Sequence, residues 1–449
     1  MKKFTNFPYT NILVLGLAKS GTAAAETLLA NDKKVIVNDM KATENDETVV
    51  NLKKMGADVI VGSHPISILN GIELLVKNPG IPYENPIVVE AVNIGIPVIT
   101  EIELAYHLTD GPIIGVTGSN GKTTTTTLVT EMLKESKQQV KVAGNIGIVA
   151  TEAVHSMSEK ETLVLELSSF QLQGIEKFKP TTAILLNIFE AHLDYHKTLD
   201  NYKRAKFNIF KNQTEADYLV YNADDKSIAD EVRKAKSNLV PFTVKSKVKT
   251  GAWADSEYIY FADDKVISRQ NIVLVGEHNL ENILAAIAAA KLNGATNDGI
   301  RTVLTTFTGV KHRLQFVGNI NGRLFYNDSK ATNMLATQKA LRAFTQPTIL
   351  LAGGLDRGNE FTDLLPFLGN VKAMVVFGET SEKLKQLSLE AGIKTILQSE
   401  DVAKATEHAY SISEENDVIL LSPACASWDQ YRTFEERGDM FVQAVHKLK

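Results

Sequence analysis

The chain has 449 residues, of which 44% are hydrophobic and 22% charged, and its formal net charge is −5. These values are ordinary for a globular protein with a large core, and they exclude the basic balance typical of nucleic-acid-binding proteins. Cys425 is the single cysteine, so no internal disulfide can form, and its small neighbours favour a packed thiol over a nucleophile.

The sequence contains neither a signal-peptide core nor an apolar run as long as a membrane span. We therefore expect a cytoplasmic monomer that binds neither a membrane nor nucleic acid. The length predicts about two to four domains.

The first predicted domain, residues 1–108, alternates short apolar strands with helices, which predicts a parallel, Rossmann-like α/β sheet. Its first strand leads through a glycine turn into an alanine-rich helix, and its second strand ends at Asp39. An acid at this spacing could hold a ribose hydroxyl, but a solvent-facing aspartate at a strand end fits equally well. The full G-x-G-x-x-G fingerprint is missing, because Ala18 stands at its second glycine.

A later strand of this domain ends in the rigid loop of residues 77–82, which contains two prolines and Asn78. Open α/β sheets bind their ligands at this edge, beyond the carboxyl ends of the strands. The loop is therefore a candidate binding segment.

The second predicted domain, residues 109–310, opens with a strand, a glycine-rich loop and a polar helix that together predict a phosphate-binding loop. The strict motif wants glycine at position 116, which is valine here, so the match is Thr-Gly-x-x-Gly-Lys-Thr. A glycine-rich turn that binds nothing is the alternative. The candidate nucleotide-binding residues are Gly118, Ser119, Asn120, Gly121, Lys122, Thr123 and Thr124.

Polar residues follow the later strands of this domain. Glu166 ends an apolar strand beside the phosphate loop, where a Mg²⁺ ligand is needed, and His192 lies just past the next strand. A basic helix over 201–211 carries Lys203 and Lys206 on one face, which could also be a solvated surface.

Residues 217–275 alternate strands and turns and predict a peripheral sheet without chemistry. Asn279 and Asn282 then precede an alanine-rich helix, where they could meet a base edge or cap the helix.

The third predicted domain, residues 311–449, is another α/β unit. It starts with a hairpin over 316–327 that turns at Asn321-Gly322, a strong two-residue turn signal. Three further apolar strands end near residues 353, 378 and 422, and each is followed by a glycine- or serine-containing loop.

Several motifs occur together and in order along the chain, and as a set they are far more specific than any one alone. They are Thr117–Thr124, Gly144-Asn145-Ile-Gly147, Glu166-Leu-Ser-Ser-Phe-Gln171, His192-Leu-Asp194, Gly276–Asn282, His312-Arg313 and Asn327–Thr332. With this set the chain resembles the Mur ligases, ATP-dependent amide ligases of peptidoglycan assembly, over its whole length. The run over 421–438 is most similar to the member that adds D-glutamate to UDP-N-acetylmuramoyl-L-alanine.

The resemblance implies a three-domain, ADP-forming ligase whose domains hold, in chain order, the UDP substrate, ATP and the amino acid. The substrate carboxylate would be phosphorylated to an acyl phosphate, which the amine of D-glutamate would attack. It also implies two Mg²⁺ sites and a carbamylated lysine. Because such ligases act in cell-wall biogenesis, the resemblance also implies roles in cell shape and cell division.

The resemblance assigns roles residue by residue. Lys122, His192, Lys206 and Glu166 would be catalytic, with Thr123, Glu166, His192 and carbamylated Lys206 as metal ligands and Lys203 as the fallback for Lys206. The nucleotide would also meet Asn279, Asn282, Arg313 and Asp328. Asp39, Asn78 and Asn145 would bind the UDP substrate, and D-glutamate would be surrounded by Lys330, Thr332, Arg357, Ser427 and Phe434.

Two positions depart from the family pattern. Ala191 stands where some relatives have an acid, so the metal shell would differ, and Arg357 stands where lysine is frequent. Arginine can hold a carboxylate through two parallel hydrogen bonds, whereas lysine is a point charge.

Three alternatives stay open at this point. The first is a folylpolyglutamate synthase, which would use a similar ATP-binding domain. The second is a Mur ligase that adds a diamino acid, which is disfavoured because the third domain contains no Asp-Asn-Pro-Arg run. The third alternative is a nucleotide-gated binding protein that ligates nothing.

Overall fold

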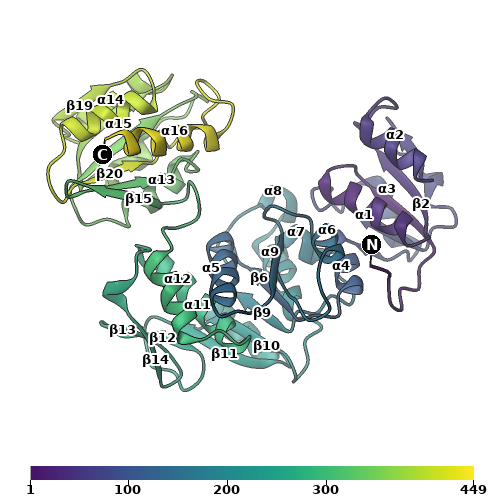
Figure 1. Ribbon diagram of the computed structural model, residues 1–449. Coiled ribbons are helices and arrows are strands. Elements are labelled where there is room, and N and C mark those ends of the chain that lie inside the picture. Colours follow the sequence, from purple (N-terminus) through teal and green to yellow (C-terminus); the bar gives the residue numbers. More distant parts are fainter. Residues whose placement is uncertain (1, 449) are drawn as a thin grey trace. The chain divides into compact units, whose positions relative to one another are not determined.

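A computed structural model describes residues 2–448. The chain folds into two compact units. The first contains the chain up to Gln270 together with Glu281–Val303, and the second contains Asn271–Leu280 and the chain from Leu304 onward. Within residues 2–448 the strands form three sheets, of five, nine and six strands. Each sheet is flanked by helices (Figure 1), which confirms the predicted α/β class.

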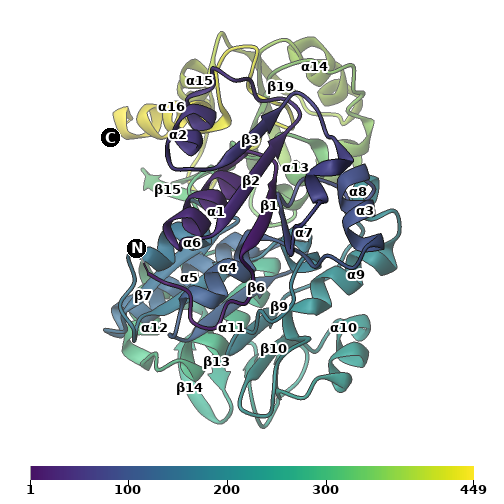
Figure 2. The same cartoon turned by 90° about the vertical axis from the view of Figure 1, so that its right-hand side faces the viewer.

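The five-stranded sheet belongs to the first unit and has the strand order β3-β2-β1-β4-β5, with every described pair parallel. Figure 2 shows β1, β2 and β3 side by side, with α1 packed against them. The central strands β1 and β4 are short apolar runs that are buried on both faces, whereas β2 and β3 are partly exposed toward the edge. The elements are β1 Asn11–Leu15, α1 Lys19–Ala30, β2 Lys34–Asp39, α2 Glu47–Lys54, β3 Asp58–Val61, η1 Ile66–Leu69, β4 Leu74–Lys77, α3 Pro86–Asn93, β5 Val98–Ile99 and α4 Glu101–Leu108.

The nine-stranded sheet has the order β14-β13-β12-β11-β10-β9-β6-β8-β7. It is parallel from β7 to β12 and ends in an antiparallel edge of β12, β13 and β14.

The elements of this part are β6 Ile113–Thr117, α5 Lys122–Glu135, β7 Val140–Gly144, α6 Ala150–His155, β8 Thr162–Glu166, α7 Ser169–Gln173, β9 Thr182–Leu185, α8 Leu193–His196, α9 Leu199–Phe207, η2 Asn208–Phe210, β10 Tyr218–Asn222, α10 Lys226–Glu231, η3 Val232–Lys234, β11 Asn238–Thr243, β12 Ala252–Ala254, β13 Tyr258–Phe261, β14 Asp264–Ser268, η4 Arg269–Asn271, α11 Glu277–Leu292 and α12 Asn297–Thr306.

Residues 217–275, which the sequence predicts as a peripheral sheet, do not form a sheet of their own. The strands β10 and β11 pair in parallel with β9 and extend the central sheet, and β12 to β14 continue it. The many charges in the turns between these strands favoured a peripheral sheet. Which strands pair, however, depends on neighbours that are distant in sequence.

The six-stranded sheet lies in the second unit and has the order β15-β16-β20-β17-β18-β19. The predicted hairpin is confirmed: β15 and β16 are antiparallel, and Asn321 and Gly322 at the turn both have positive φ, 50° and 81°. The elements are β15 Gln315–Ile320, β16 Arg323–Asn327, α13 Met334–Leu341, β17 Thr348–Gly353, η5 Thr362–Phe367, β18 Val371–Phe377, α14 Ser381–Glu390, β19 Thr395–Gln398, α15 Val402–Ser411, β20 Val418–Leu421 and α16 Phe434–Lys447.

A buried carboxylate ties α4 to the segment that follows α7. Glu103 accepts hydrogen bonds from the backbone N–H groups of Glu176, Lys177 and Phe178, at 2.9, 2.7 and 3.0 Å. Burial raises the pKa of Glu103, but His107 and these three donors outweigh burial, so the pKa lies below its ordinary value. The apolar side chains of α4 pack into two cores. Leu104 lies in the core of the five-stranded sheet, and Ile102 and Leu108 lie in the core of the nine-stranded sheet.

None of the helices described within residues 2–448 is long and apolar enough to cross a membrane.

We expect Glu103→Gln to destabilise the first unit by about 1–3 kcal/mol at pH 7, because the amide cannot accept all three N–H groups. A group with a lowered pKa stabilises the fold above its unfolded pKa, about 4.3 for glutamate, and loses this effect as the pH falls through the folded value. The difference between wild type and variant, measured by urea unfolding, should therefore shrink at acid pH. Glu47→Gln, an exposed control on α2, should change stability by less than about 0.5 kcal/mol. Equal losses in both variants would contradict this role for Glu103.

Candidate active site

The loop between β6 and α5 has the backbone geometry of a phosphate cradle. Gly121 has φ +83°, and a Cβ atom there would lie 2.0 Å from the Oδ1 atom of Asn282, so this position requires glycine. The N–H groups of Ser119 and Asn120 bond to the carbonyl and side-chain oxygens of Asn187, at 2.8 and 2.9 Å. The first-turn N–H groups of α5, which begins at Lys122, lack partners within their own helix and therefore attract anions.

Two lysine side chains meet at this loop. The Nζ atoms of Lys122 and Lys206 each donate a hydrogen bond to the carbonyl oxygen of Gly118, both at 2.8 Å. Lys206 comes from α9 and is 1% exposed, and within residues 2–448 it takes part in no ion pair. Burial, and then the charge of Lys122, hold the pKa of Lys206 well below its ordinary value. The loop thus gathers backbone N–H groups and two lysine amines, an arrangement that suits an anionic ligand.

A carboxylate lies at the same edge of the sheet. In the sheet register Glu166, the last residue of β8, pairs with Val116 of β6 and Gly144 of β7. Its Oε1 atom accepts a hydrogen bond of 2.9 Å from the side chain of Asn145, while its Oε2 atom is buried and has no partner in the described part of the chain. A buried carboxylate oxygen without a donor is a natural ligand for a hard cation.

His192 precedes α8 and lies in the left-handed region, with φ 55°. Its ring meets that of Phe170 edge to face, with 5.0 Å between centroids. Burial lowers the pKa of His192, and the charges of Lys206 and Lys122 lower it further, so the imidazole is neutral at neutral pH.

The residues present fit a magnesium ion that is shared with a nucleotide. Across residues 2–448 no three His, Cys, Asp or Glu side chains form a metal site by themselves. Magnesium usually keeps several waters and is held by one or two carboxylates together with substrate phosphates. Glu166 has the unpartnered oxygen that such a partial shell needs, and Thr123, in the first turn of α5, is the second predicted ligand.

The two predicted substrate residues of the five-stranded sheet support their own loops. Asp39 accepts hydrogen bonds from the backbone N–H groups of Leu17, Lys41 and Ala42, at 2.7, 2.7 and 2.9 Å. Burial raises the pKa of Asp39, but these donors outweigh it and the pKa is lowered overall. Asn78 donates to the hydroxyl of Ser20 at 3.1 Å, which joins the loop after β4 to the start of α1.

In the second unit, the predicted amino-acid residues follow three neighbouring strands, β16, β17 and β20. The Nζ atom of Lys330 lies 5.0 Å from the ring centroid of Phe434, and the Arg357 guanidinium lies 4.9 Å from that of Trp428. The hydroxyl of Ser427 is buried and has no partner among the described residues. Thr332 lies on the turn after Lys330, where its N–H bonds to the Lys330 carbonyl at 2.9 Å.

The remaining nucleotide candidates have contacts of their own. The side chain of Asn279 donates to the carbonyl of Val275 at 2.7 Å, and Asn282 lies against Gly121. Asp328 accepts hydrogen bonds from Ser422 at 2.9 Å and from the N–H of Leu314 at 3.1 Å. Burial raises the pKa of Asp328 to about 7, although the charge of the exposed Arg313 opposes this rise.

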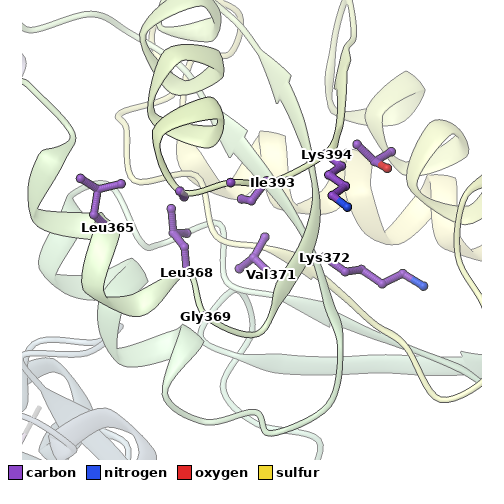
Figure 3. A pocket seen from close by; sticks show the side chains of 10 residues that line it. Leu365, Leu368, Gly369, Val371, Lys372, Ile393 and Lys394 are labelled. Atoms are coloured by element: carbon purple, nitrogen blue, oxygen red, sulfur yellow. The ribbon is translucent and has the colours of Figure 1, made fainter.

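Two hollows of the surface lie away from these residues. One of about 530 Å³ is formed between η5, β18 and β19 and is lined by Leu368, Val371, Lys372 and Ile393 (Figure 3). These residues lie at the amino-terminal ends of the strands, whereas Arg357 and Ser427 follow the carboxyl ends. A second hollow, of about 360 Å³, likewise lies at the start of β6.

Family models match three successive parts of the chain. They are described as a Mur ligase MurD-like N-terminal domain over residues 10–100, a Mur ligase middle domain over 116–290 and a Mur ligase glutamate ligase domain over 312–425. The chain belongs to the Mur ligase family. This confirms the predicted family and its three-domain α/β fold, in preference to the folylpolyglutamate synthases.

Two curated Mur ligases match the chain from end to end. Both are named UDP-N-acetylmuramoylalanine–D-glutamate ligase; that of Oceanobacillus iheyensis is 61% identical over 449 residues, and that of Geobacillus kaustophilus is 56% identical over 451, each covering 100% of both chains. Among solved structures, the MurF ligase of Thermotoga maritima in complex with ADP matches with a TM-score of 0.58 at 20% identity, covering 99% of this chain and 97% of that one. At this identity the structural match supports the fold alone.

As a Mur ligase, the chain is an ATP-dependent, ADP-forming amide ligase that uses ATP and Mg²⁺. The residue assignments within the site stay predictions.

Sequence reasoning missed two residues that shape the Mur ligase phosphate loop. Asn187, two residues after β9, holds the loop with its carbonyl and its side chain. The hydroxyl of Tyr202 lies 2.9 Å from that of Ser119, and the Tyr202 ring lies 4.8 Å from the Lys206 Nζ atom. Tyr202 precedes Lys206 by one helical turn, and this spacing could have predicted that the two side chains lie on the same face of α9.

We expect Gly121→Ala to abolish nucleotide binding while leaving the fold intact, because the added Cβ would clash with Asn282 and displace the loop. Isothermal titration with ADP measures the binding, and circular dichroism measures the fold. Gly392→Ala is the matched control, because Gly392 also has positive φ, +75°, but no atom within 4 Å of an added Cβ. Normal ADP affinity in Gly121→Ala would contradict the role of this loop.

Proposed function

We propose that this Mur ligase joins D-glutamate to UDP-N-acetylmuramoyl-L-alanine in the cytoplasm, as a monomer, during peptidoglycan precursor synthesis. The observation that carries the proposal is the carboxyl edge of the nine-stranded sheet. There the phosphate loop, two lysines and the unpartnered oxygen of Glu166 meet. The choice of substrates follows the names of relatives that are 56% and 61% identical over the whole chain.

The reaction begins when the carboxylate of the UDP substrate attacks the γ-phosphorus of ATP, which forms an acyl phosphate and releases ADP. Lys122 and the N–H groups of α5 stabilise the negative charge that builds on the transferred phosphoryl group. Bound Mg²⁺ supplies further charge neutralisation at these oxygens. Thr123 and Glu166 would hold one ion, and His192 with Lys206 would hold a second.

The second half of the reaction forms the amide. The amine of D-glutamate attacks the acyl carbon, and the tetrahedral intermediate expels phosphate. Asp39, Asn78 and Asn145 would bind the UDP substrate, and Asn145 already contacts Glu166.

D-glutamate would be bound by Lys330, Thr332, Arg357, Ser427 and Phe434, which follow the carboxyl ends of strands in one sheet. Asn279, Asn282, Arg313 and Asp328 would contact the nucleotide. We also propose the division into residues 1–108, 109–310 and 311–449 for the UDP substrate, ATP and D-glutamate.

Lys206 would act as a carbamate. Its amine is buried, without an ion-pair partner among residues 2–448, and beside a second cation, so a neutral or anionic form is favoured over the ammonium. Addition of the neutral amine to CO₂, with loss of one proton, forms a carbamate and so places a carboxylate where the neutral amine stood. That carboxylate would then balance Lys122 and supply oxygen to a metal.

We expect phosphate release from ATP, Mg²⁺ and UDP-N-acetylmuramoyl-L-alanine to require D-glutamate. L-glutamate and lysine are the controls and should give no release, because the acceptor side chains would face a different stereochemistry or charge. The measurement is a coupled phosphate assay with mass spectrometry of the product.

Release that is indifferent to every amino acid would contradict the proposed function. Release with L-glutamate and a folate acceptor would move the activity to a different ligase class.

We expect Lys206→Ala to lose at least about 100-fold in kcat and to regain part of it in the presence of formate or acetate, because a free carboxylate replaces the carbamate oxygens. Lys203→Ala is the matched control from the same helix and should keep its activity, with no response to added carboxylate. Loss of activity without rescue, together with an unmodified Lys206 mass in the wild type, would contradict the carbamate.

A further inference from the structure

An exposed tryptophan lies at the predicted D-glutamate loop of the second unit. Trp428 follows Ser427 and is 65% exposed, which is unusual for the largest apolar side chain. Its ring is covered on one face by the guanidinium of Arg357, at 4.9 Å from the ring centroid. The two residues come from different loops, the one after β17 and the one after β20.

The backbone holds these two loops in register. The N–H of Gly353 bonds to the carbonyl of Pro423 at 3.0 Å, and the N–H of Leu355 bonds to the carbonyl of Ala426 at 2.9 Å. Arg357 and Trp428 each lie two residues beyond this second bond. The contact of the Arg357 guanidinium with the Trp428 ring therefore results from the joining of the strand ends.

Neighbouring side chains anchor each loop. Asp356, beside Arg357, forms an ion pair with Lys383 at 2.9 Å, and its N–H donates to Glu379 at 3.0 Å. Asp429, beside Trp428, accepts a hydrogen bond of 3.2 Å from the N–H of Glu379. Glu379 thus connects both loops through separate atoms, and the carboxylate next to Arg357 is already neutralised by Lys383.

No carboxylate among the described residues pairs with the Arg357 guanidinium, so its charge can act on a ligand. Within residues 2–448 Arg357 forms no ion pair, and its side chain is exposed. A guanidinium stacked on an aromatic face keeps its N–H groups in its own plane, where they can grip a carboxylate through two parallel hydrogen bonds. A lysine ammonium can also lie over an aromatic ring, but it has no plane for the ring to orient, so the orienting effect of the tryptophan is specific to arginine.

We propose that Trp428 is a positioning residue that holds the Arg357 guanidinium flat, with its in-plane N–H groups presented to the side-chain carboxylate of D-glutamate. This inference rests on the proposed function. Beyond that function, the affinity for D-glutamate would depend on Arg357 and Trp428 together, so that the effect of changing one depends on the presence of the other.

A double-mutant cycle tests the pair. We expect Trp428→Leu to raise the KM for D-glutamate about threefold to fivefold and to leave kcat and the KM for the UDP substrate unchanged, because an exposed stacking interaction is lost. Trp428→Phe keeps an aromatic face and should recover most of the loss. In an Arg357→Lys background, Trp428→Leu should change the KM for D-glutamate less than about 1.5-fold, because an ammonium has no plane for the ring to orient.

Tryptophan fluorescence gives a readout apart from turnover. Trp253, the other tryptophan, stacks on Tyr260 at 4.1 Å between β12 and β13, and Trp253→Phe keeps that stack while leaving Trp428 as the emitter. We expect D-glutamate to change the emission of this variant in the presence of a non-hydrolysable ATP analogue and the UDP substrate. Adding Arg357→Gln should remove the change.

Additive effects of Trp428→Leu and Arg357→Lys, an equal rise in the KM for the UDP substrate, or an emission change that survives Arg357→Gln would each overturn the inference. These outcomes are read in enzyme that turns over with D-glutamate. Failure of the wild type to turn over with D-glutamate would instead overturn the proposed function, so the two are distinguishable.

Discussion

Two lysine side chains donate to one carbonyl oxygen, that of Gly118, and this concentration of positive charge governs the arrangement around it. One of the two, Lys206, is removed from water, and a buried cation without a paired anion is costly. Such an arrangement is tolerable where an anionic ligand or a modified side chain supplies the missing charge. The nearby carboxylate of Glu166 cannot do this alone, since one of its oxygens is bonded to Asn145 and the other is left unpartnered. Phosphate oxygens, a metal and a carbamate together would balance the site.

The geometry that brings these charges together comes from the sheet. The strands β6, β8, β7 and β9 are parallel neighbours, so their carboxyl ends lie at one edge. Side chains far apart in sequence, such as Asn145 and Glu166, then meet within hydrogen-bond distance. The six-stranded sheet uses the same device, where backbone bonds between the loops after β17 and β20 set Arg357 against Trp428. In both sheets the strands provide a rigid frame and the loops carry the chemistry.

Much of the fold could be predicted because its signals are local. Short apolar runs mark most strands, and Asn321-Gly322 marks the hairpin, whose turn needs positive φ at both positions. The lysine and threonine at the start of α5 mark the phosphate loop. The strands over 217–275 were predicted as a peripheral sheet, without their pairing to the central sheet, because β9, the partner of β10, lies outside their own stretch of sequence. Asn187 and Tyr202 were missed for a related reason, since their roles appear once the loop is folded against them.

The amino-acid sequence by itself determined the α/β class, the three successive α/β domains, the phosphate loop and the Mur ligase family, because each depends on short-range patterns or on motifs kept in order. The tertiary structure alone decided which polar atoms are satisfied and which are left for a ligand. Asp39 turned out to bind three backbone N–H groups, while Glu166 kept one oxygen without a partner among the described residues. Burial and neighbouring charge, which shift the pKa values of Lys206 and Asp328, are likewise properties of packed neighbours. Hydrogen-bond partners and pKa shifts both depend on distances in space. The separation of two residues along the chain does not reveal that distance.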